Sequence, residues 1–189
     1  MDTLFPLAPV FPEGFSYFED FLSREEEQKL LQIVTAIAVH PFIFQGYTAN
    51  RKVASFGFDY SFTNRKLAKG KEIPAEFDFL IKKVAAKIST NATDFAELLV
   101  TKYPPGSVIN WHRDAPPFDM IVGISLLNDC IFRLRPQEKT KQTRRNVISF
   151  SVKRRSLYII QGESRTDWQH SIAPVKNTRY SVTLRTLLK

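Results

Sequence analysis

The spacing of apolar residues predicts two amphipathic helices in the first half of the chain. Ser23 and Glu26 form a capping-box pattern that opens a helix over about residues 24–38. A second helix opens at Pro74, a residue suited to a first helical turn, and runs to about residue 89. Apolar residues recur at intervals of three and four along both segments, so each helix has a stripe that can be buried.

The other apolar residues alternate with polar ones or form short runs, which is typical of β-strands. An aromatic, alternating run covers residues 42–62, and a basic loop is expected over residues 64–72. Beyond residue 95, turn signals such as Pro104-Pro105-Gly106 separate runs of strand length. The expected strands are residues 97–103, 108–113, 119–127, 131–134, 147–152, 156–160, 169–172 and 179–187.

Eight short strands in succession predict a double-sheet jelly roll, also called a double-stranded β-helix. The fold class is therefore mainly β with flanking helices (α+β). A length of 189 residues suits one domain, and no repeat or linker divides it. We expect residues 1–95 to form an N-terminal extension and residues 96–189 to form the jelly-roll core. Residues 1–22, rich in Pro and Phe, are expected to pack on the domain as an arm.

Composition indicates the class of protein and the cellular compartment. Hydrophobic residues make up 43% and charged residues 24%, as in ordinary globular proteins. No segment approaches the length of a membrane span, and the first residues lack a secretory pattern. Cys130 is the lone cysteine, which excludes an internal disulfide and a thiolate metal cluster. We expect a monomer in the cytoplasm, with no membrane association.

A formal net charge of +8 indicates a polyanionic partner, of which nucleic acid is the most plausible. Any single basic cluster is as well explained by a solvated loop or strand end. Several clusters in one small domain favour a basic face that neutralises phosphates. The clusters are Arg51-Lys52, Arg65-Lys66 with Lys69 and Lys71, Lys139 through Arg145, and Lys153-Arg154-Arg155.

Two of the three histidines lie in segments that suggest an iron site. In Trp111-His112-Arg113-Asp114, the histidine and aspartate are two residues apart and would share one face of a strand. A distant histidine, His170, would complete the two-histidine, one-carboxylate triad that holds non-heme Fe(II). His112 alone could equally be an ordinary strand histidine. Its place after a turn, with His170 downstream, favours the metal site, and Arg179 is well placed to bind the far carboxylate of a keto acid.

A wider set of motifs extends this pattern over the second half of the chain. Lys102-Tyr103-Pro104-Pro105-Gly106 precedes the His-x-Asp motif, and Gly162-Glu163-Ser164-Arg165 precedes Trp168-Gln169-His170-Ser171-Ile172. Arg179 and Arg185 then form an Arg-x5-Arg pair. From Leu98 onward, the chain resembles the AlkB family of Fe(II)/2-oxoglutarate-dependent dioxygenases, the nucleic-acid dealkylases.

The resemblance implies Fe(II), 2-oxoglutarate and O2 as cofactor and cosubstrates, with His112, Asp114 and His170 as metal ligands. It also implies that Tyr103 and Arg179 hold the distal carboxylate of 2-oxoglutarate, and that Arg185 lies near the keto-acid end. No side chain beyond the metal ligands is expected to be catalytic. Residues 179, 181, 183 and 185 share one strand face, and two arginines facing into a barrel need an anion to offset their desolvation. The alternative is that both arginines decorate an edge strand.

The resemblance reaches upstream to the segment from Arg51 to Phe62, which is similar to the family's nucleotide-recognition segment. It implies that Phe62 stacks on the target base and that Tyr60 contacts phosphate or sugar, with Arg51 as a third substrate-binding residue. Such stacking suits a base that has left the helix. Sixteen phenylalanines in the chain make a place in the core an equal alternative for Phe62.

Three positions depart from the family pattern. Thr101 stands where members often have Asn two residues before the tyrosine, and Ser181 stands where they commonly have Asn after the first arginine. Thr101 and Ser181 are still expected to take part in the 2-oxoglutarate site. Ala115-Pro116-Pro117-Phe118 replaces the acidic residues that often follow His-x-Asp, so the preferred lesion is left open.

These observations predict oxidative dealkylation of N-alkylated bases in DNA, with RNA as a further substrate, releasing an aldehyde, succinate and CO2. A second hypothesis keeps the iron site but changes the substrate to a protein, a lipid or a small molecule. A third is a jelly-roll nucleic-acid-binding protein without turnover, which would require the loss of a metal ligand.

Overall fold

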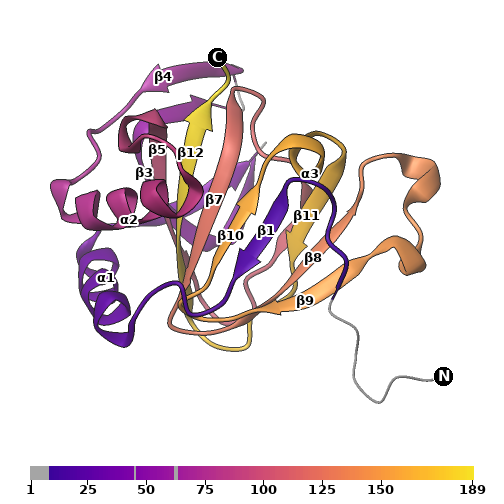
Figure 1. The fold of residues 1–189 in the computed structure, drawn as a ribbon, viewed down its shortest axis with the longest axis horizontal. Coiled ribbons are helices and arrows are strands. Elements are labelled where there is room, and N and C mark those ends of the chain that lie inside the picture. Colours follow the sequence, from indigo (N-terminus) through magenta and orange to yellow (C-terminus); the bar gives the residue numbers. More distant parts are fainter. Residues whose placement is uncertain (1–8, 45, 62–63) are drawn as a thin grey trace.

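The computed structural model describes residues 9–44, 46–61 and 64–189, and within them the strands form two facing sheets (Figure 1). The major sheet has eight strands and the minor sheet has four in this described part. In spatial order the major sheet runs β1 (Phe15–Phe18), β10 (Leu157–Ile160), β7 (Phe118–Leu126), β12 (Arg179–Leu187), β5 (Phe95–Tyr103), β3 (Tyr47–Ser61) and β2 (His40–Phe44), with β4 (Lys66–Lys69) beside β3. The minor sheet runs β6 (Ile109–His112), β11 (Trp168–Ile172), β8 (Cys130–Pro136) and β9 (Ile148–Val152).

Two helices cover the face of the major sheet that points away from the minor sheet (Figure 1). Helix α1 (Arg24–Ala36) begins with the predicted capping box, in which the Glu26 amide donates to Ser23 Oγ over 3.1 Å and the Ser23 amide donates to Glu26 Oε2 over 2.7 Å. A 3-10 turn (Ala75–Phe77) leads from Pro74 into α2 (Asp78–Ile88). Both predicted helices are therefore present at the expected places.

The apolar residues form two cores, one on each face of the major sheet. Leu30, Leu80 and Val182 belong to the core between the helices and the sheet. Phe118 and Leu134 belong to the core between the two sheets. Because side chains alternate along a strand, β12 points its apolar residues at the helices and its polar residues into the space between the sheets. This alternation places the polar chemistry inside the jelly roll.

One of the expected local structures was wrong. Residues 64–72 are not only a loop, because Lys66–Lys69 form the edge strand β4, paired with β3 from Phe58 to Ser61. Lysines on an edge strand discourage its pairing with other chains, so a basic sequence is compatible with a strand there. In the segment expected to be an N-terminal arm, Phe15–Phe18 form β1, which pairs with β10. No described helix has the length and apolar character needed to span a bilayer.

The basic cluster at residues 153–155 is neutralised within the fold. Arg154 donates from Nε to Glu27 Oε2 over 3.0 Å, although Glu27 is only 1% exposed. The amide of Leu127 also donates to Glu27, over 2.9 Å, so this pair joins α1 to the end of β7. The two neighbouring ion pairs are Lys153 with Asp129 and Arg155 with Asp20. These three cations therefore serve the fold and are not free to neutralise phosphates.

The contact between Gly123 and Tyr158 yields a stability prediction. Gly123 of β7 lies opposite Tyr158 of β10, and a Cβ added to it would lie 2.1 Å from Cζ of the tyrosine ring. We expect Gly123→Ala to lower the free energy of unfolding by about 1–3 kcal/mol because the ring must move within a filled core, and urea unfolding measures this. In a Tyr158→Leu background the shorter side chain leaves room, so the same substitution should cost less. An equal loss in both backgrounds would contradict the contact.

Candidate metal centre

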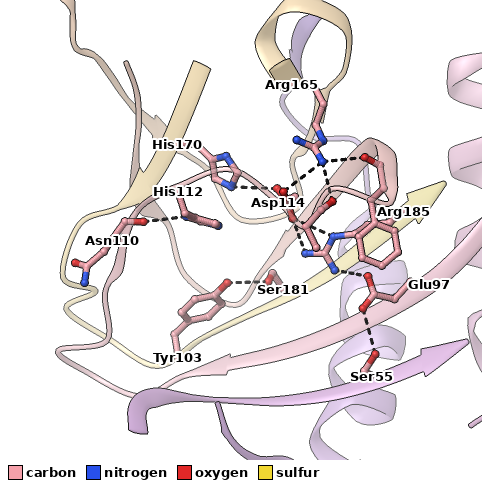
Figure 2. Close-up of polar contacts among 12 residues, drawn as sticks. Ser55, Glu97, Tyr103, Asn110, His112, Asp114, Arg165, His170, Ser181 and Arg185 are labelled. Atoms are coloured by element: carbon pink, nitrogen blue, oxygen red, sulfur yellow. Dashed lines mark hydrogen bonds and ion pairs between the residues drawn. The ribbon is translucent and has the colours of Figure 1, made fainter. Parts of the chain in front are cut away.

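The three predicted metal ligands come together between the two sheets. His112 ends β6 and pairs with His170 of β11, so that their ring centroids lie 4.2 Å apart. Asp114 approaches from the connection between β6 and β7, with Oδ2 at 3.5 Å from Nε2 of His170 (Figure 2). One ligand atom from each residue lies within 4.8 Å of the others. This spacing lets the three side chains bind one ion on a common side.

Both histidines are in the form that binds metal. Nδ1 of His112 donates to the carbonyl oxygen of Asn110 over 2.8 Å, which leaves the Nε2 lone pair for a ligand (Figure 2). Burial lowers the pKa of His112 below its usual value. Burial, together with the nearby His112, lowers the pKa of His170 to about 3. Both imidazoles are therefore neutral at pH 7.

The two carboxylate oxygens of Asp114 have different environments. Oδ1 accepts from Nε and Nη2 of Arg185, over 3.0 and 2.8 Å. Oδ2 is buried and has no hydrogen-bond partner among the described residues. Burial alone would raise the pKa of Asp114, but the charge of Arg185 holds this pKa well below its usual range. A buried, ionised and unpaired oxygen is costly unless a cation satisfies it, so these residues fit Fe(II).

The position of Asp114 differs from the expected one. Strand β6 ends at His112, so Asp114 lies beyond the strand and does not share a strand face with that histidine. Pro116 and Pro117 follow after Ala115, and proline cannot supply the amide that a strand ladder needs. Strand alternation therefore does not bring the carboxylate to the metal, and other contacts must hold the connection in place.

Arg165 supplies these contacts. Its Nη2 donates to three carbonyl oxygens of the connection, those of Asp114 (3.3 Å), Ala115 (2.8 Å) and Phe118 (2.8 Å) (Figure 2). Arg165 belongs to the Gly-Glu-Ser-Arg motif, which forms the short helix α3 (Gly162–Thr166) between β10 and β11. This motif is one of those that carry the family resemblance, and in the structure its arginine holds the connection that bears Asp114.

A second residue that sequence reasoning missed is Glu97 of β5. Nη1 of Arg185 lies 2.5 Å from Glu97 Oε2, and Ser55 Oγ donates to Glu97 Oε1 over 3.2 Å. Burial raises the pKa of Glu97 and the charge of Arg185 opposes this. The only sequence signal was an acidic residue inside an apolar strand. The guanidinium of Arg185 is thus shared by Glu97 and Asp114, and its expected contact with the keto acid stays a prediction.

Arg179 occupies a separate, fully buried position at the start of β12. Its Nε donates to Ser125 Oγ over 3.2 Å, whereas Nη1 and Nη2 have no partner among the described residues. Its guanidinium lies 4.8 Å from the centroid of the Tyr103 ring, and the Tyr103 hydroxyl is 3.2 Å from Ser181 Oγ. Thr101 is buried directly opposite Ser181. Two unpaired donors on a buried arginine fit a carboxylate, which would accept from both.

The metal ligands open into a cavity of about 1250 Å³. Thr101 and Tyr103 of β5 line it, as do Arg51 and Tyr60 of the neighbouring strand β3. The guanidinium of Arg51 lies 4.0 Å from the centroid of the Phe42 ring, and burial lowers its pKa. The structure therefore brings two of the three predicted substrate residues to the cavity. The third, Phe62, lies outside the described residues.

A family model described as the 2OG-Fe(II) oxygenase superfamily matches residues 14–186. The chain belongs to this superfamily. It is therefore a dioxygenase enzyme that uses Fe(II), 2-oxoglutarate and O2, as the sequence predicted. The three converging ligands described above form its candidate iron site.

Several curated relatives of this oxygenase are tRNA enzymes. The tRNA (carboxymethyluridine(34)-5-O)-methyltransferase alkbh8 of Xenopus tropicalis is 27% identical over 175 residues, covering 90% of this chain and 27% of its own length. ALKBH8 of Mus musculus is 27% identical over 173 residues, covering 88% of this chain and 25% of its own length. The chain thus spans about a quarter of these relatives. The uncharacterized protein L905 of Acanthamoeba polyphaga mimivirus is 25% identical over 193 residues, covering 93% of this chain and 86% of L905.

Solved structures of other oxygenases share the fold. The structure of OsALKBH1 has a TM-score of 0.72 at 15% identity, covering 96% of this chain and 100% of that one. A prolyl hydroxylase from Trichoplax adhaerens, in complex with a hypoxia inducible factor peptide fragment, has a TM-score of 0.65 at 18% identity, covering 92% and 83%. The predicted jelly roll is confirmed by these likenesses. The predicted AlkB resemblance is confirmed by the superfamily match together with the ALKBH8 relatives and OsALKBH1.

Removal of one ligand should abolish metal binding while leaving the fold intact. We expect Asp114→Ala and His112→Ala each to weaken Mn(II) binding by more than about a hundredfold, since loss of a supporting residue alone costs 10–100-fold. Anaerobic calorimetry measures the affinity and circular dichroism checks the fold. His40→Ala is the matched control, because His40 is exposed on β2 and outside the ligand cluster. Undiminished metal affinity in the Asp114 variant would refute the ligand assignment.

Arg179→Met should act on the cosubstrate and not on the metal. Loss of a buried charged pair with a carboxylate costs about 2 kcal/mol or more, so we expect KM for 2-oxoglutarate to rise roughly 30-fold or more. The unliganded protein should be no less stable than wild type, because the variant removes an unpaired buried charge. Steady-state kinetics and urea unfolding measure the two effects. Arg24→Met, at the exposed start of α1, is the control; a KM like that of the control would contradict the assignment.

Proposed function

We propose that this dioxygenase oxidatively dealkylates N-alkylated bases in DNA, and also in RNA, with release of an aldehyde, succinate and CO2. The observation that carries the proposal is the composition of the cavity. One end contains the metal ligands, and β3 contributes Arg51 and Tyr60 to its wall. A cationic and an aromatic side chain beside an oxidising centre suit a base and its phosphate.

Bound Fe(II), with 2-oxoglutarate and O2, would supply the oxidation of the alkyl carbon attached to the base nitrogen. The protein's part is to hold and orient the reactants. The unpaired Nη atoms of Arg179 would receive the far carboxylate of 2-oxoglutarate, next to the Tyr103 hydroxyl. The metal ligands lie between the two sheets, so a base would have to leave its stack to reach them.

The cations around the cavity support a nucleic-acid substrate. Four exposed basic residues lie in the hairpin of β3 and β4 or just after it. One of the four, Lys71, also lines the cavity. No ion pair to a carboxylate is found for any of the four in the described part of the chain. The residues are Arg65, Lys66, Lys69 and Lys71. The ALKBH8 relatives are named for activity on tRNA, which supports the same substrate class for the part that they share with this chain.

A protein substrate is the second candidate, because the prolyl hydroxylase with a bound peptide has the same fold. Because no ion pair is found for these four cations in the described part of the chain, we favour nucleic acid over it. The third hypothesis, binding without turnover, would need a missing ligand, and all three ligands converge here. A cytoplasmic location and a monomeric state remain predictions from composition.

The test is mass spectrometry of oligonucleotides that carry N-methyl or etheno adducts, incubated with protein, Fe(II), 2-oxoglutarate and ascorbate. We expect wild type to remove the adduct mass and Asp114→Ala to leave it. We expect Arg51→Met to lower adduct removal at least about tenfold, the value of one charged hydrogen bond, and to spare the slow decay of 2-oxoglutarate without substrate.

Tyr47→Leu, on the same strand and exposed, is the control for the β3 substitution. Succinate formation that depends on Asp114, without loss of any adduct, would send the search to peptide substrates. Folded, metal-loaded protein that produces neither signal would count against the enzyme assignment itself.

A further inference from the structure

The outer face of the minor sheet carries polar and basic residues that the site does not use. His112 and His170 point between the sheets, so by alternation Trp111 of β6 lies on the outer face. On β8, Phe132 and Leu134 belong to the inner core. Arg133, which lies between these two residues, and Arg135, which follows Leu134, therefore point outward beside Trp111. Their partners on β11, Ser171 and Gln169, lie on the same outer face.

The two outward arginines are held in place. The guanidinium carbons of Arg133 and Arg135 lie 5.1 and 4.5 Å from the centroid of the Trp111 ring. Nε of Arg133 donates to Ser171 Oγ over 3.0 Å, and Nε of Arg135 donates to Gln169 Oε1 over 2.7 Å. Each guanidinium therefore has a fixed direction, so little side-chain entropy would be lost when its remaining N–H groups bind a ligand.

No carboxylate neutralises this pair among the described residues. Arg135 is affected first by burial and then by the charge of Arg133, both of which lower its pKa. The cluster at residues 153–155 shows the opposite arrangement, because each of its cations has an acidic partner. Two adjacent, ordered guanidinium groups without a counter-charge are a site for an anion.

The connection from β8 to β9 extends the same positive charge. It contains two 3-10 turns (Lys139–Lys141 and Arg144–Asn146) and projects from the body of the molecule beyond the ends of both strands (Figure 1). Within residues 133–145 there are six cationic residues and one carboxylate, a net charge of +5 out of a total of +8. The carboxylate, Glu138, lies 2.7 Å from Lys141. Most of the protein's excess charge thus lies in this one segment.

We propose that this surface, the minor-sheet basic face, binds the phosphate backbone of the nucleic-acid strand whose base enters the cavity. It consists of Trp111, Arg133, Arg135, Lys139, Lys141, Arg144 and Arg145. The inference rests on the proposed function and adds to it a contact outside the cavity. Trp111 directly precedes the metal ligand His112, and the exposed Arg113 lines the cavity. A strand that leaves the cavity past Arg113 would therefore meet the face.

Charge complementarity decides the occupant. Planar guanidinium groups with free N–H donors match phosphate oxygens, and a row of such groups positions a strand without reading its sequence. Exposed cations on the β8–β9 connection would add salt-dependent affinity. The face is therefore expected to bind unmodified and modified strands alike, and to leave lesion choice to the cavity.

The test uses fluorescence anisotropy of a labelled single-stranded oligonucleotide at 50–200 mM salt, with the full chain and Mn(II) bound. One variant replaces Lys139, Lys141, Arg144 and Arg145 with Gln, all exposed residues of the connection. A second variant carries Arg133→Gln and Arg135→Gln. The control removes the same number of charges as the first variant from other exposed sites, with Lys29, Lys82, Lys87 and Lys176 replaced by Gln.

We expect both variants to bind at least about tenfold more weakly than the control at 50 mM salt. The slope of log affinity against log salt should fall by about 0.7 for each phosphate that the variant no longer neutralises. Turnover of an alkylated trinucleotide, too short to follow the face, should match wild type.

Each outcome separates this inference from the proposed function. Wild-type dealkylation and binding, with both variants equal to the control, would overturn the basic face and leave the dealkylase intact. Weaker binding by the variants in a protein that removes no adduct would support the face and overturn the dealkylase. Wild-type protein that binds no oligonucleotide would overturn both.

Discussion

The buried ion pairs of Arg185 hold the centre of this oxygenase together. One guanidinium on β12 bonds to Asp114, which faces the metal site, and to Glu97 on β5. Without Arg185, two largely buried carboxylates would lie close together beside the cavity, and their repulsion would raise the pKa of at least one of them. Because the arginine keeps Asp114 ionised, its free oxygen remains open to a cation.

The charges of the site follow from this arrangement. Arg185 bonds to both acidic residues; burial raises the pKa of Glu97, whereas the charge of Arg185 holds the pKa of Asp114 low. Fe(II) and the doubly charged 2-oxoglutarate cancel each other, so together they would add no net charge to this buried site. Among the described residues, two nitrogens of Arg179 and Oδ2 of Asp114 have no hydrogen-bond partner, and the keto acid and the metal would bind at these atoms.

The sequence predicted the helices, most strands and the converging ligands, because capping, alternation and motif spacing are local signals. It could not predict Glu97, whose importance depends on a pairing with Arg185 across neighbouring strands. It also misplaced Asp114 on a strand, since the contacts of Arg165 that hold the connection come from about fifty residues away. The basic clusters looked alike in the sequence. Only the fold shows that residues 153–155 form ion pairs with acids, whereas Arg133 and Arg135 form none in the part of the chain that the structure describes.

The place of β12 in the major sheet has a consequence for the newly made chain. It comes after every other described strand in the sequence, yet it lies between β5 and β7 in the middle of the sheet. Until it inserts, β5 and β7 have open edges, and neither Arg185 nor Arg179 is present. During synthesis, when the amino-terminal parts emerge first, the three candidate iron ligands are therefore made before Arg185, which bonds to Asp114, and before Arg179. The two arginines of the site reach it only when the last described strand joins the middle of the sheet.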